Sequence, residues 1–178
     1  MQSVVSATGV PTVGQHGLKM KRVWQQNTPG TTMSNIGNRN GVLYLAMHTM
    51  HWYPNIGNSY VDQYLAWFIP PKTARYRFYA QCDDNCQLIL GNTPLQSSDV
   101  TKVFEILSYT TDMFPVSEEQ INKQRSEWIQ LTKDEPYYFE AGFIEMGGDD
   151  SFVMAVEIEG QVDPSHQHGI REVQHLSV

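Results

Sequence analysis

Short apolar runs separated by turn-forming residues recur along most of this chain, and their spacing limits the folds that it can adopt. Between residues 60 and 158 the runs begin about 8–12 residues apart, with Gly, Pro, Asn and Asp gathered between them. Within the runs, aromatic and aliphatic residues alternate with polar ones, as expected for strands with one face in a core. Helical periodicity is nearly absent, and no segment alternates strand with helix. The pattern predicts an all-β fold, an antiparallel β-sandwich or barrel with at most one or two short helices.

The strands are best defined in the middle and towards the end of the sequence. Residues 60–71 form an aromatic-rich run that ends at Pro70 and Pro71, which cannot donate hydrogen bonds to a sheet. Residues 42–54 are apolar but of uncertain structure, and residues 101–110 fit either a strand or a helix. Further strands are expected at residues 17–24, 72–81, 86–91, 126–132, 136–146 and 151–159.

One segment has a helical pattern, and the two ends of the chain differ in composition from its middle. In residues 115–128, Ser117 precedes Glu118, Glu119 and Gln120 as a helix start signal. Length favours one domain with a substantial core, since the chain has 178 residues. We expect a linker at residues 1–16, a β-sandwich domain at residues 17–160, and a C-terminal extension or linker to a next domain at residues 161–178.

The net charge and the apolar runs exclude two classes of partner. The formal net charge is -7, whereas nucleic acids and anionic membranes attract a cationic face. No apolar run approaches the roughly 18 residues of a membrane helix. We therefore expect no nucleic-acid partner and no insertion of this domain into a membrane. The first residues lack the basic start and apolar core of a signal peptide, which fits a cytosolic chain and equally a domain excised from a larger secreted protein.

Two cysteines bracket three polar residues between two expected strands. Four residues of extended chain span about 13 Å at roughly 3.3 Å per residue, whereas a disulfide requires Cα atoms about 4.4–6.8 Å apart. Cys82 and Cys86 can therefore be joined only if the chain reverses between them, and the flanking alternation predicts a hairpin there. A disulfide and a pair of free thiols both fit this pattern. Structural zinc is disfavoured, because no second Cys or His pair has suitable spacing.

Adjacent carboxylates between these cysteines are the sharpest chemical signal. Asp83 and Asp84 repel each other in a constrained turn unless a cation neutralises them. Ca²⁺ takes about six to eight oxygen ligands and accepts irregular loops. Asp83, Asp84 and the side-chain oxygen of Asn85 are therefore candidate ligands, and a second acidic loop adds Asp149 and Asp150. The alternative is that both loops merely use residues that favour turns.

The remaining polar and aromatic candidates are weaker. No nucleophile elbow, zincin helix, phosphate loop or dinucleotide motif occurs, and Glu140 and Glu145 are five residues apart, on opposite faces of a strand. The sequence therefore predicts no enzyme activity. The pairs His48–His51 and His166–His168 are loose, and ordinary surface roles are favoured over metal binding. Four tryptophans could stack on sugars, although most are expected in the core; Trp52 is the candidate ligand-binding residue among Trp24, Trp52, Trp67 and Trp128.

Residues 59–90, "SYVDQYLAWFIPPKTARYRFYAQCDDNCQLIL", resemble the PA14 domain. They contain its aromatic-rich strand, a Pro-Pro step into a Thr-x-x-Tyr-x-Phe strand, and an Asp-Asp pair before an apolar strand. Residues 126–158 continue the resemblance through the last three strands of that domain, so it covers roughly residues 17–160. Within the PA14 group, residues 17–36 and 136–150 are most similar to the versions in fibrocystin and fibrocystin-like cell-surface proteins.

The resemblance implies a β-sandwich of the kind found in secreted adhesins, toxins, glycosidases and receptors. In the yeast adhesin lectins of the family, an Asp-Asp pair joined by a cis peptide bond binds one Ca²⁺, and glycan hydroxyls complete its coordination. Asp83 and Asp84 match these two residues. The adhesins also have a second loop with an Asn ligand, to which no residue of this chain is matched, and the bracketing cysteines are not general to the family.

The resemblance therefore predicts a non-catalytic extracellular recognition or adhesion module within a large, membrane-anchored cell-surface protein. Its expected partner is a glycan or an extracellular protein ligand, and its expected cofactor is Ca²⁺ bound at the Asp83–Asp84 loop. The alternative is a structural spacer or protein-interaction domain of a receptor ectodomain, with no metal or glycan site.

Overall fold

The computed structural model describes residues 18–24, 43–47, 51–52, 57–107, 122–162 and 171–175, and the side chains of residues 57–107 and 122–160. Residues 122–124 are helical. Within this part of the chain, no helix is long and apolar enough to cross a membrane. The strands are β1 (Leu18–Trp24), β2 (Leu43–Met47), β3 (His51–Trp52), β4 (Tyr60–Phe68), β5 (Ala74–Asp83), β6 (Asn85–Gly91), β7 (Val100–Ile106), β8 (Ile129–Leu131), β9 (Tyr137–Glu145), β10 (Ser151–Val162) and β11 (Arg171–His175).

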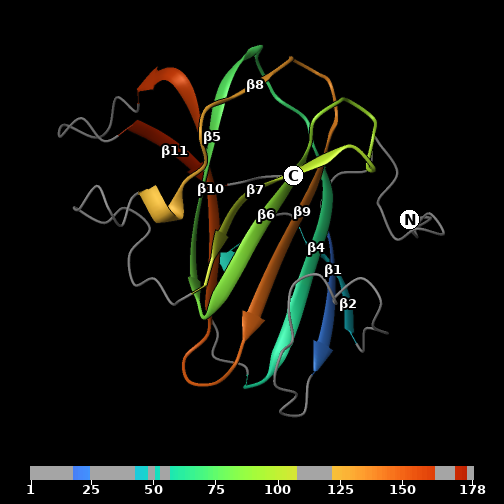
Figure 1. Ribbon diagram of the computed structural model, residues 1–178, viewed down its shortest axis with the longest axis vertical. Coiled ribbons are helices and arrows are strands. Elements are labelled where there is room, and N and C mark those ends of the chain that lie inside the picture. Colours follow the sequence, from blue (N-terminus) through green and yellow to red (C-terminus); the bar gives the residue numbers. More distant parts are fainter. Residues whose placement is uncertain are drawn as a thin grey trace.

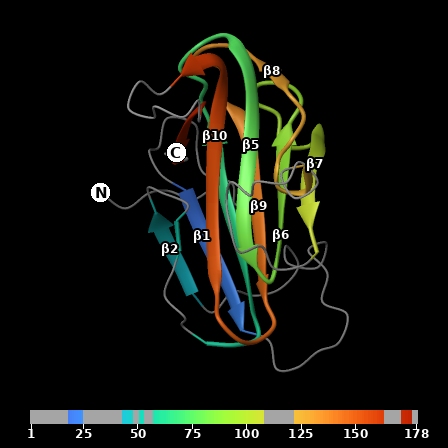
Figure 2. The ribbon, with the colours of Figure 1, turned by 90° about the vertical axis from the view of Figure 1, so that its left-hand side faces the viewer.

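The strands form two antiparallel sheets, as the sequence predicts. One sheet has the order β2-β1-β4-β9-β6-β7, and the other has the order β11-β10-β5-β8, with β3 paired to β10. Figure 1 shows the two sheets from the front. In Figure 2, β10 and β5 run side by side, with β1 and β2 to one side of them and β6 and β7 to the other. The prediction of an all-β sandwich is therefore confirmed.

Most expected strands are present, including those whose sequence pattern was ambiguous. Residues 42–54 contain β2 and β3, and residues 101–110 contain most of β7. The C-terminal extension at residues 161–178 contains β11. The expected helix is described only from residue 122, so its start signal at Ser117 lies outside the described residues.

The expected hairpin at residues 76–90 is wrong. β5 belongs to the five-stranded sheet and β6 to the six-stranded sheet, so the chain crosses from one layer to the other between them. Alternation of apolar and polar residues shows that a segment has one buried face, but it does not show which strand lies beside it. Both arms bury their inward faces in the same core, which gives the same sequence pattern as a hairpin.

Aromatic side chains from both sheets fill the space between the layers. The rings of Phe143 on β9 and Phe152 on β10 stack with centroids 5.3 Å apart, and Tyr60 on β4 meets Phe143 edge-on at 5.7 Å. All three side chains are almost fully buried. Such contacts add roughly 0.5–1.5 kcal/mol per pair beyond area burial. They form a rigid base beneath the end of the sandwich where the acidic loops lie.

Candidate cation site at one end of the sandwich

Two connections between the sheets meet at the same end of the molecule. The β5–β6 connection contains Asp84, and the β9–β10 connection contains residues 146–150. Both lie at the lower end of the view in Figure 1. The strand register holds them together, because Asp83 pairs with Ser151 across β5 and β10, and Asn85 pairs with Ile144 across β6 and β9. The two acidic loops identified in the sequence are therefore neighbours.

A disulfide closes the β5–β6 connection. Cys82 and Cys86 are bonded, with Cα atoms 6.1 Å apart, and both are fully buried in the core. The bond thus links the end of a strand in one sheet to the start of a strand in the other. Between the cysteines, the Asp83–Asp84 peptide bond is cis. A short ring around this dipeptide limits the positions that the two carboxylates can take.

Hydrogen bonds join the second acidic loop to its surroundings. The backbone amide of Met146 donates to Oδ2 of Asp84 at 2.7 Å. The hydroxyl of Tyr60 donates to Oδ2 of Asp150 at 2.6 Å, in a buried position. The amide of Gly148 donates to Oδ1 of Asn58 at 3.3 Å. The loop is therefore held against the β5–β6 connection and the start of β4.

Negative charge accumulates at this end and raises the pKa of two carboxyl groups. The pKa of Asp83 is raised by burial and then by the charges of Asp84, Asp149 and Asp150. The pKa of Glu145 rises to about 7, because its burial and the charges of Asp84, Asp150 and Asp83 all disfavour the ionised form. Either a proton or a metal cation would relieve this repulsion.

All five predicted metal-site residues lie at this end, but their exposure differs. Asp83, Asp84 and Asn85 are half-buried, Asp149 is exposed and Asp150 is 3% exposed. The sequence did not identify Glu145 as a candidate metal-site residue, although it is the last residue of β9, at this end, and is only 1% exposed. The signal was available in the alternation of β9, since the inward-facing series Phe139, Ala141, Phe143 continues to an acidic residue.

The donor atoms at this end fit a hard cation by their chemistry. The side-chain oxygen of Asn85 is buried and has no hydrogen-bond partner among the described residues, and the buried carboxylate of Glu145 is faced by the backbone amide of Gly147, which offsets only part of the rise in its pKa. Buried acceptors of this kind are costly unless something positive faces them. Oxygen donors suit Ca²⁺ rather than zinc or copper. In the described part of the chain, however, no three His, Cys, Asp or Glu side chains already surround one point as ligands.

The other candidate residues do not join this site. Glu140 lies on the outer face of the sheet, where its Oε1 accepts a 2.7 Å hydrogen bond from Gln63, so the prediction that it faces away from Glu145 is confirmed. Trp67 and Trp128 are half-buried rather than in the core, contrary to expectation; Trp128 instead stacks 4.2 Å from the guanidinium of Arg77. Trp52 pairs with Phe152 through β3. The side chains of Trp24, Trp52, His48, His51, His166 and His168 lie outside the described residues.

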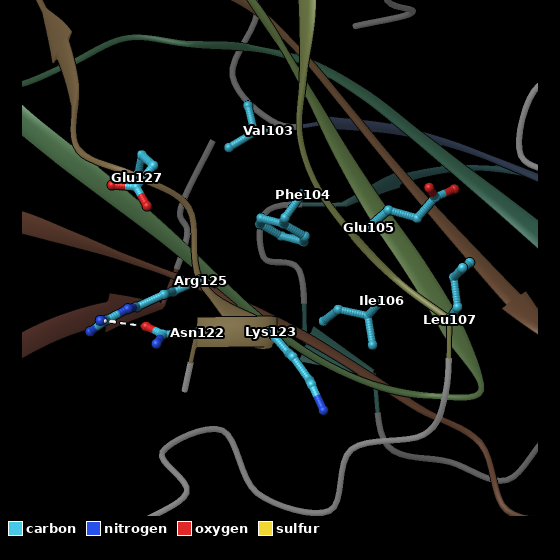
Figure 3. Close-up of a pocket in the computed structure, with 9 residues that line it drawn as sticks. All are labelled: Val103, Phe104, Glu105, Ile106, Leu107, Asn122, Lys123, Arg125 and Glu127. Carbon is cyan, nitrogen blue, oxygen red and sulfur yellow. Dashed lines mark hydrogen bonds between the residues drawn. The ribbon is translucent and has the colours of Figure 1, made fainter. Parts of the chain in front are cut away.

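A separate pocket lies along β7, the last strand of the six-stranded sheet in the described part of the chain. Its volume is about 520 Å³, and it is lined by residues of β7 and the 122–127 segment. Figure 3 shows Phe104 and Ile106 within it, with the amino group of Lys123 pointing away from the phenyl ring. Arg125 at its rim is hydrogen-bonded to Asn122 at 2.7 Å. This pocket has an apolar floor and none of the acidic-loop residues.

Comparisons of sequence find no relative. No protein-family model matches the chain, and no curated protein matches it.

Comparisons of structure find several similar folds. The A domain of Epithelial Adhesin 6 from Candida glabrata, solved in complex with Galb1-3GlcNAc, has a TM-score of 0.59 at 11% identity, covering 86% of this chain and 83% of the adhesin domain. A PA14 sugar-binding domain from an RTX adhesin has a TM-score of 0.57 at 13% identity, covering 91% and 98%. An anti-sigma factor domain-containing protein from Clostridium clariflavum has a TM-score of 0.62 at 12% identity, covering 92% of this chain. The chain spans only 45% of that last protein. The chain therefore has the PA14-like β-sandwich fold.

Proposed function

We propose that this domain is a non-catalytic recognition module that binds glycans outside the cell through Ca²⁺ held at Asp83 and Asp84. The observation that carries the proposal is the meeting of two acidic loops at one end of the sandwich, where the strand register brings the Asp83–Asp84 dipeptide beside residues 144–151. The chemistry of the donor atoms supports it, because the buried side-chain oxygen of Asn85 has no hydrogen-bond partner among the described residues. Adhesin domains with the same fold bind sugars, among them the Epithelial Adhesin 6 domain in complex with Galb1-3GlcNAc and the sugar-binding domain of the RTX adhesin, which adds support from analogy.

The residues around the cation would determine which glycans bind. When bound, Ca²⁺ would offer coordination positions to neighbouring hydroxyl groups of a sugar. The exposed carboxylate of Asp149 and the half-buried one of Asp83 surround that position with negative charge. Like charges repel an anionic ligand. We therefore expect neutral glycans to bind more tightly than sialylated or sulfated ones, with Trp52 remaining the proposed sugar-stacking residue.

The proposed location is the cell surface, as part of a membrane-anchored, fibrocystin-like protein. The Cys82–Cys86 bond supports an oxidising compartment, since stable disulfides are rare in the cytosol. The resemblance of residues 17–36 and 136–150 to fibrocystin-like sequences supports the proposal that the domain belongs to a cell-surface protein of that kind. An extracellular protein ligand at the same end remains an alternative partner.

A spacer or protein-interaction domain without a metal site is the second candidate. It is favoured by the hydrogen bonds that Asp84 and Asp150 already make to Met146 and Tyr60. These bonds show that acidic side chains here can shape the loops. In that case no cation would be needed for folding or binding.

Calorimetric titration with Ca²⁺ distinguishes the two candidates. If the domain is a recognition module, the wild type should release or absorb heat on binding Ca²⁺ and Asp83→Ala should not. The control Glu105→Ala, which removes an exposed charge on β7, should titrate like the wild type. Neutral and sialylated glycans are then compared in Ca²⁺ and in chelator. An absence of heat in the wild type, with an unchanged melting temperature, would leave only the spacer.

A further inference from the structure

The pocket along β7 lies between the edges of the two sheets. In the described part of the chain, β7 ends the six-stranded sheet, and residues 124–126 continue the edge of the five-stranded sheet beyond β8. The backbone amide of Ser126 donates to the carbonyl oxygen of Phe78 on β5 at 2.8 Å, and Arg125 forms a bridge with Tyr79. Figure 2 shows β7 and β8 on the same side of the molecule. The pocket, of about 520 Å³, therefore reaches the core from this side, and its volume suits a small molecule.

Apolar side chains of β7 and the residue after it form one wall of the pocket. Phe104 and Ile106 are 9% and 4% exposed and belong to the main core. Val103 packs against the same core. Just beyond the strand, Leu107 is 72% exposed, more than any other large hydrophobic residue in the described part of the chain. The wall is therefore anchored in the core and ends in an apolar side chain that the fold leaves in solvent.

Polar and cationic residues form the opposite wall. Asn122, Lys123 and Arg125 line it from the short helical turn and the segment that follows. Asn122 accepts a 2.7 Å hydrogen bond from the guanidinium of Arg125. Figure 3 shows Glu127 towards the Val103 end of the pocket, away from Lys123. The side of the pocket at Lys123 is therefore more positive than the side at Glu127.

β7 itself is poorly suited to pairing with a further strand. Its register against β6 shifts between Leu88 and Ile89, which makes Val103 an extra, bulged residue. The exposed side chains of Lys102 and Glu105 form a 2.5 Å ion pair along it. Bulges and charged side chains keep edge strands from pairing with another chain. These features favour a ligand that fills the pocket over a peptide that extends the sheet.

We propose that this pocket binds a small amphipathic anion, whose apolar body lies against Phe104, Ile106 and Leu107 and whose acidic group lies towards Lys123. The inference goes beyond the proposed function and does not rest on it, because the residues that line the pocket are separate from the acidic loops. An apolar wall alone accepts any small hydrophobic molecule, whereas a cation at one side selects an anionic one. The formal net charge of -7 disfavours anions over the surface as a whole, so this selectivity must come from the local cation.

The test titrates the domain with octanoate, 1-octanol and octylammonium, which share one alkyl chain and differ in charge. Amide resonances are followed by nuclear magnetic resonance. We expect saturable shifts at residues 103–107 and 122–127, with octanoate bound about two- to fivefold more tightly than octanol, the size of an exposed ion pair, and octylammonium bound most weakly. Lys123→Gln should remove the preference for octanoate. Lys72→Gln, which removes an exposed charge between β4 and β5, should retain it.

A second pair of variants tests the apolar wall. Leu107→Ser should weaken the binding of all three probes about tenfold, whereas Leu95→Ser, at a leucine that is 60% exposed and outside the pocket, should leave it unchanged. All four substituted side chains are exposed, so the fold should be retained. Equal wild-type affinities for octanoate and octanol, or an absence of saturable shifts at residues 103–107, would overturn the inference. The titrations are made in chelator, so their outcome is independent of Ca²⁺ binding at Asp83 and Asp84.

Discussion

The backbone amide of Met146 donates a 2.7 Å hydrogen bond to Oδ2 of Asp84. This bond links the first residue after β9 to the connection between β5 and β6, and so joins two inter-sheet loops that are 62 residues apart in sequence. Because the bond consumes one oxygen of Asp84 and leaves the other, Asp84 can brace the second loop and still contribute to a cation site.

The first prediction is that Ca²⁺ reverses the pH dependence of stability. Without metal, the pKa of Glu145 is about 7 in the folded state against 4.5 for the free side chain, so the folded state holds a proton that the unfolded state has released. The contribution of Glu145 to stability should therefore be fully present below pH 4.5 and be lost as the pH rises to about 7. Bound Ca²⁺ favours the ionised form, so its stabilisation should be lost on acidification.

Melting temperatures across this pH range, measured with and without Ca²⁺, check the reversal. Glu145→Gln should flatten the metal-free slope, whereas Glu140→Gln should retain it. Parallel curves in the two conditions would contradict the prediction.

The second prediction concerns the hydroxyl of Tyr60. Tyr60→Phe removes the donor to Oδ2 of Asp150, which is 3% exposed, and should lower the free energy of unfolding by about 1–3 kcal/mol. Tyr64→Phe is the matched control, because the Tyr64 hydroxyl also donates to a buried acid, Asp62, at 3.1 Å. Both variants should be less stable in urea denaturation. Only Tyr60→Phe should also alter the Ca²⁺ affinity, since only Tyr60 holds the second acidic loop; an equal effect of Tyr64→Phe would argue against this.

The sequence predicted the two-sheet architecture and the main strands because alternation is a local property. Strand partners are not local, and this is why the segment around Cys82 and Cys86 was mistaken for a hairpin although it crosses between layers. Proximity of Asp83 to Asp150 likewise depends on the pairing of β5 with β10, whose residues are about 70 positions apart.

The candidate site was predicted in its first loop and only partly in its second. Asp83 and Asp84 are adjacent in sequence, so the pair could be recognised from the motif. Glu145 was judged only against Glu140, as a catalytic pair, and was not considered with residues from another strand. Its burial arises from its place on the inward face of β9 beyond Phe143, and its significance appears only when the register brings β6 beside β9.

The third prediction is that reduction of the disulfide weakens both the fold and the proposed site. Closing a ring of five residues stabilises a protein by about 2 kcal/mol through loop-closure entropy. The double variant Cys82→Ala/Cys86→Ala should lose at least this much in urea denaturation, because both sulfur atoms are fully buried. Its Ca²⁺ affinity should also fall, since Asp83 and Asp84 lie within the ring. Reducing agent should change the wild type in the same direction and leave the double variant unaffected; unchanged Ca²⁺ binding would show that the ring does not position the acids.

The fourth prediction tests the packing at the opposite end of β6. A Cβ atom added at Gly91 would lie 3.0 Å from the backbone nitrogen of Tyr138 and 3.1 Å from the backbone oxygen of Gln96. Backbone atoms within a sheet cannot yield as a flexible side chain can, so Gly91→Ala should lower the free energy of unfolding by about 1–3 kcal/mol. Gly147→Ala is the control, because its added Cβ would come no closer than 4.0 Å to Asn58, and its effect should stay within about 0.5 kcal/mol. Urea denaturation measures both, and a larger loss for Gly147→Ala than for Gly91→Ala would contradict the close packing of β6 against β9.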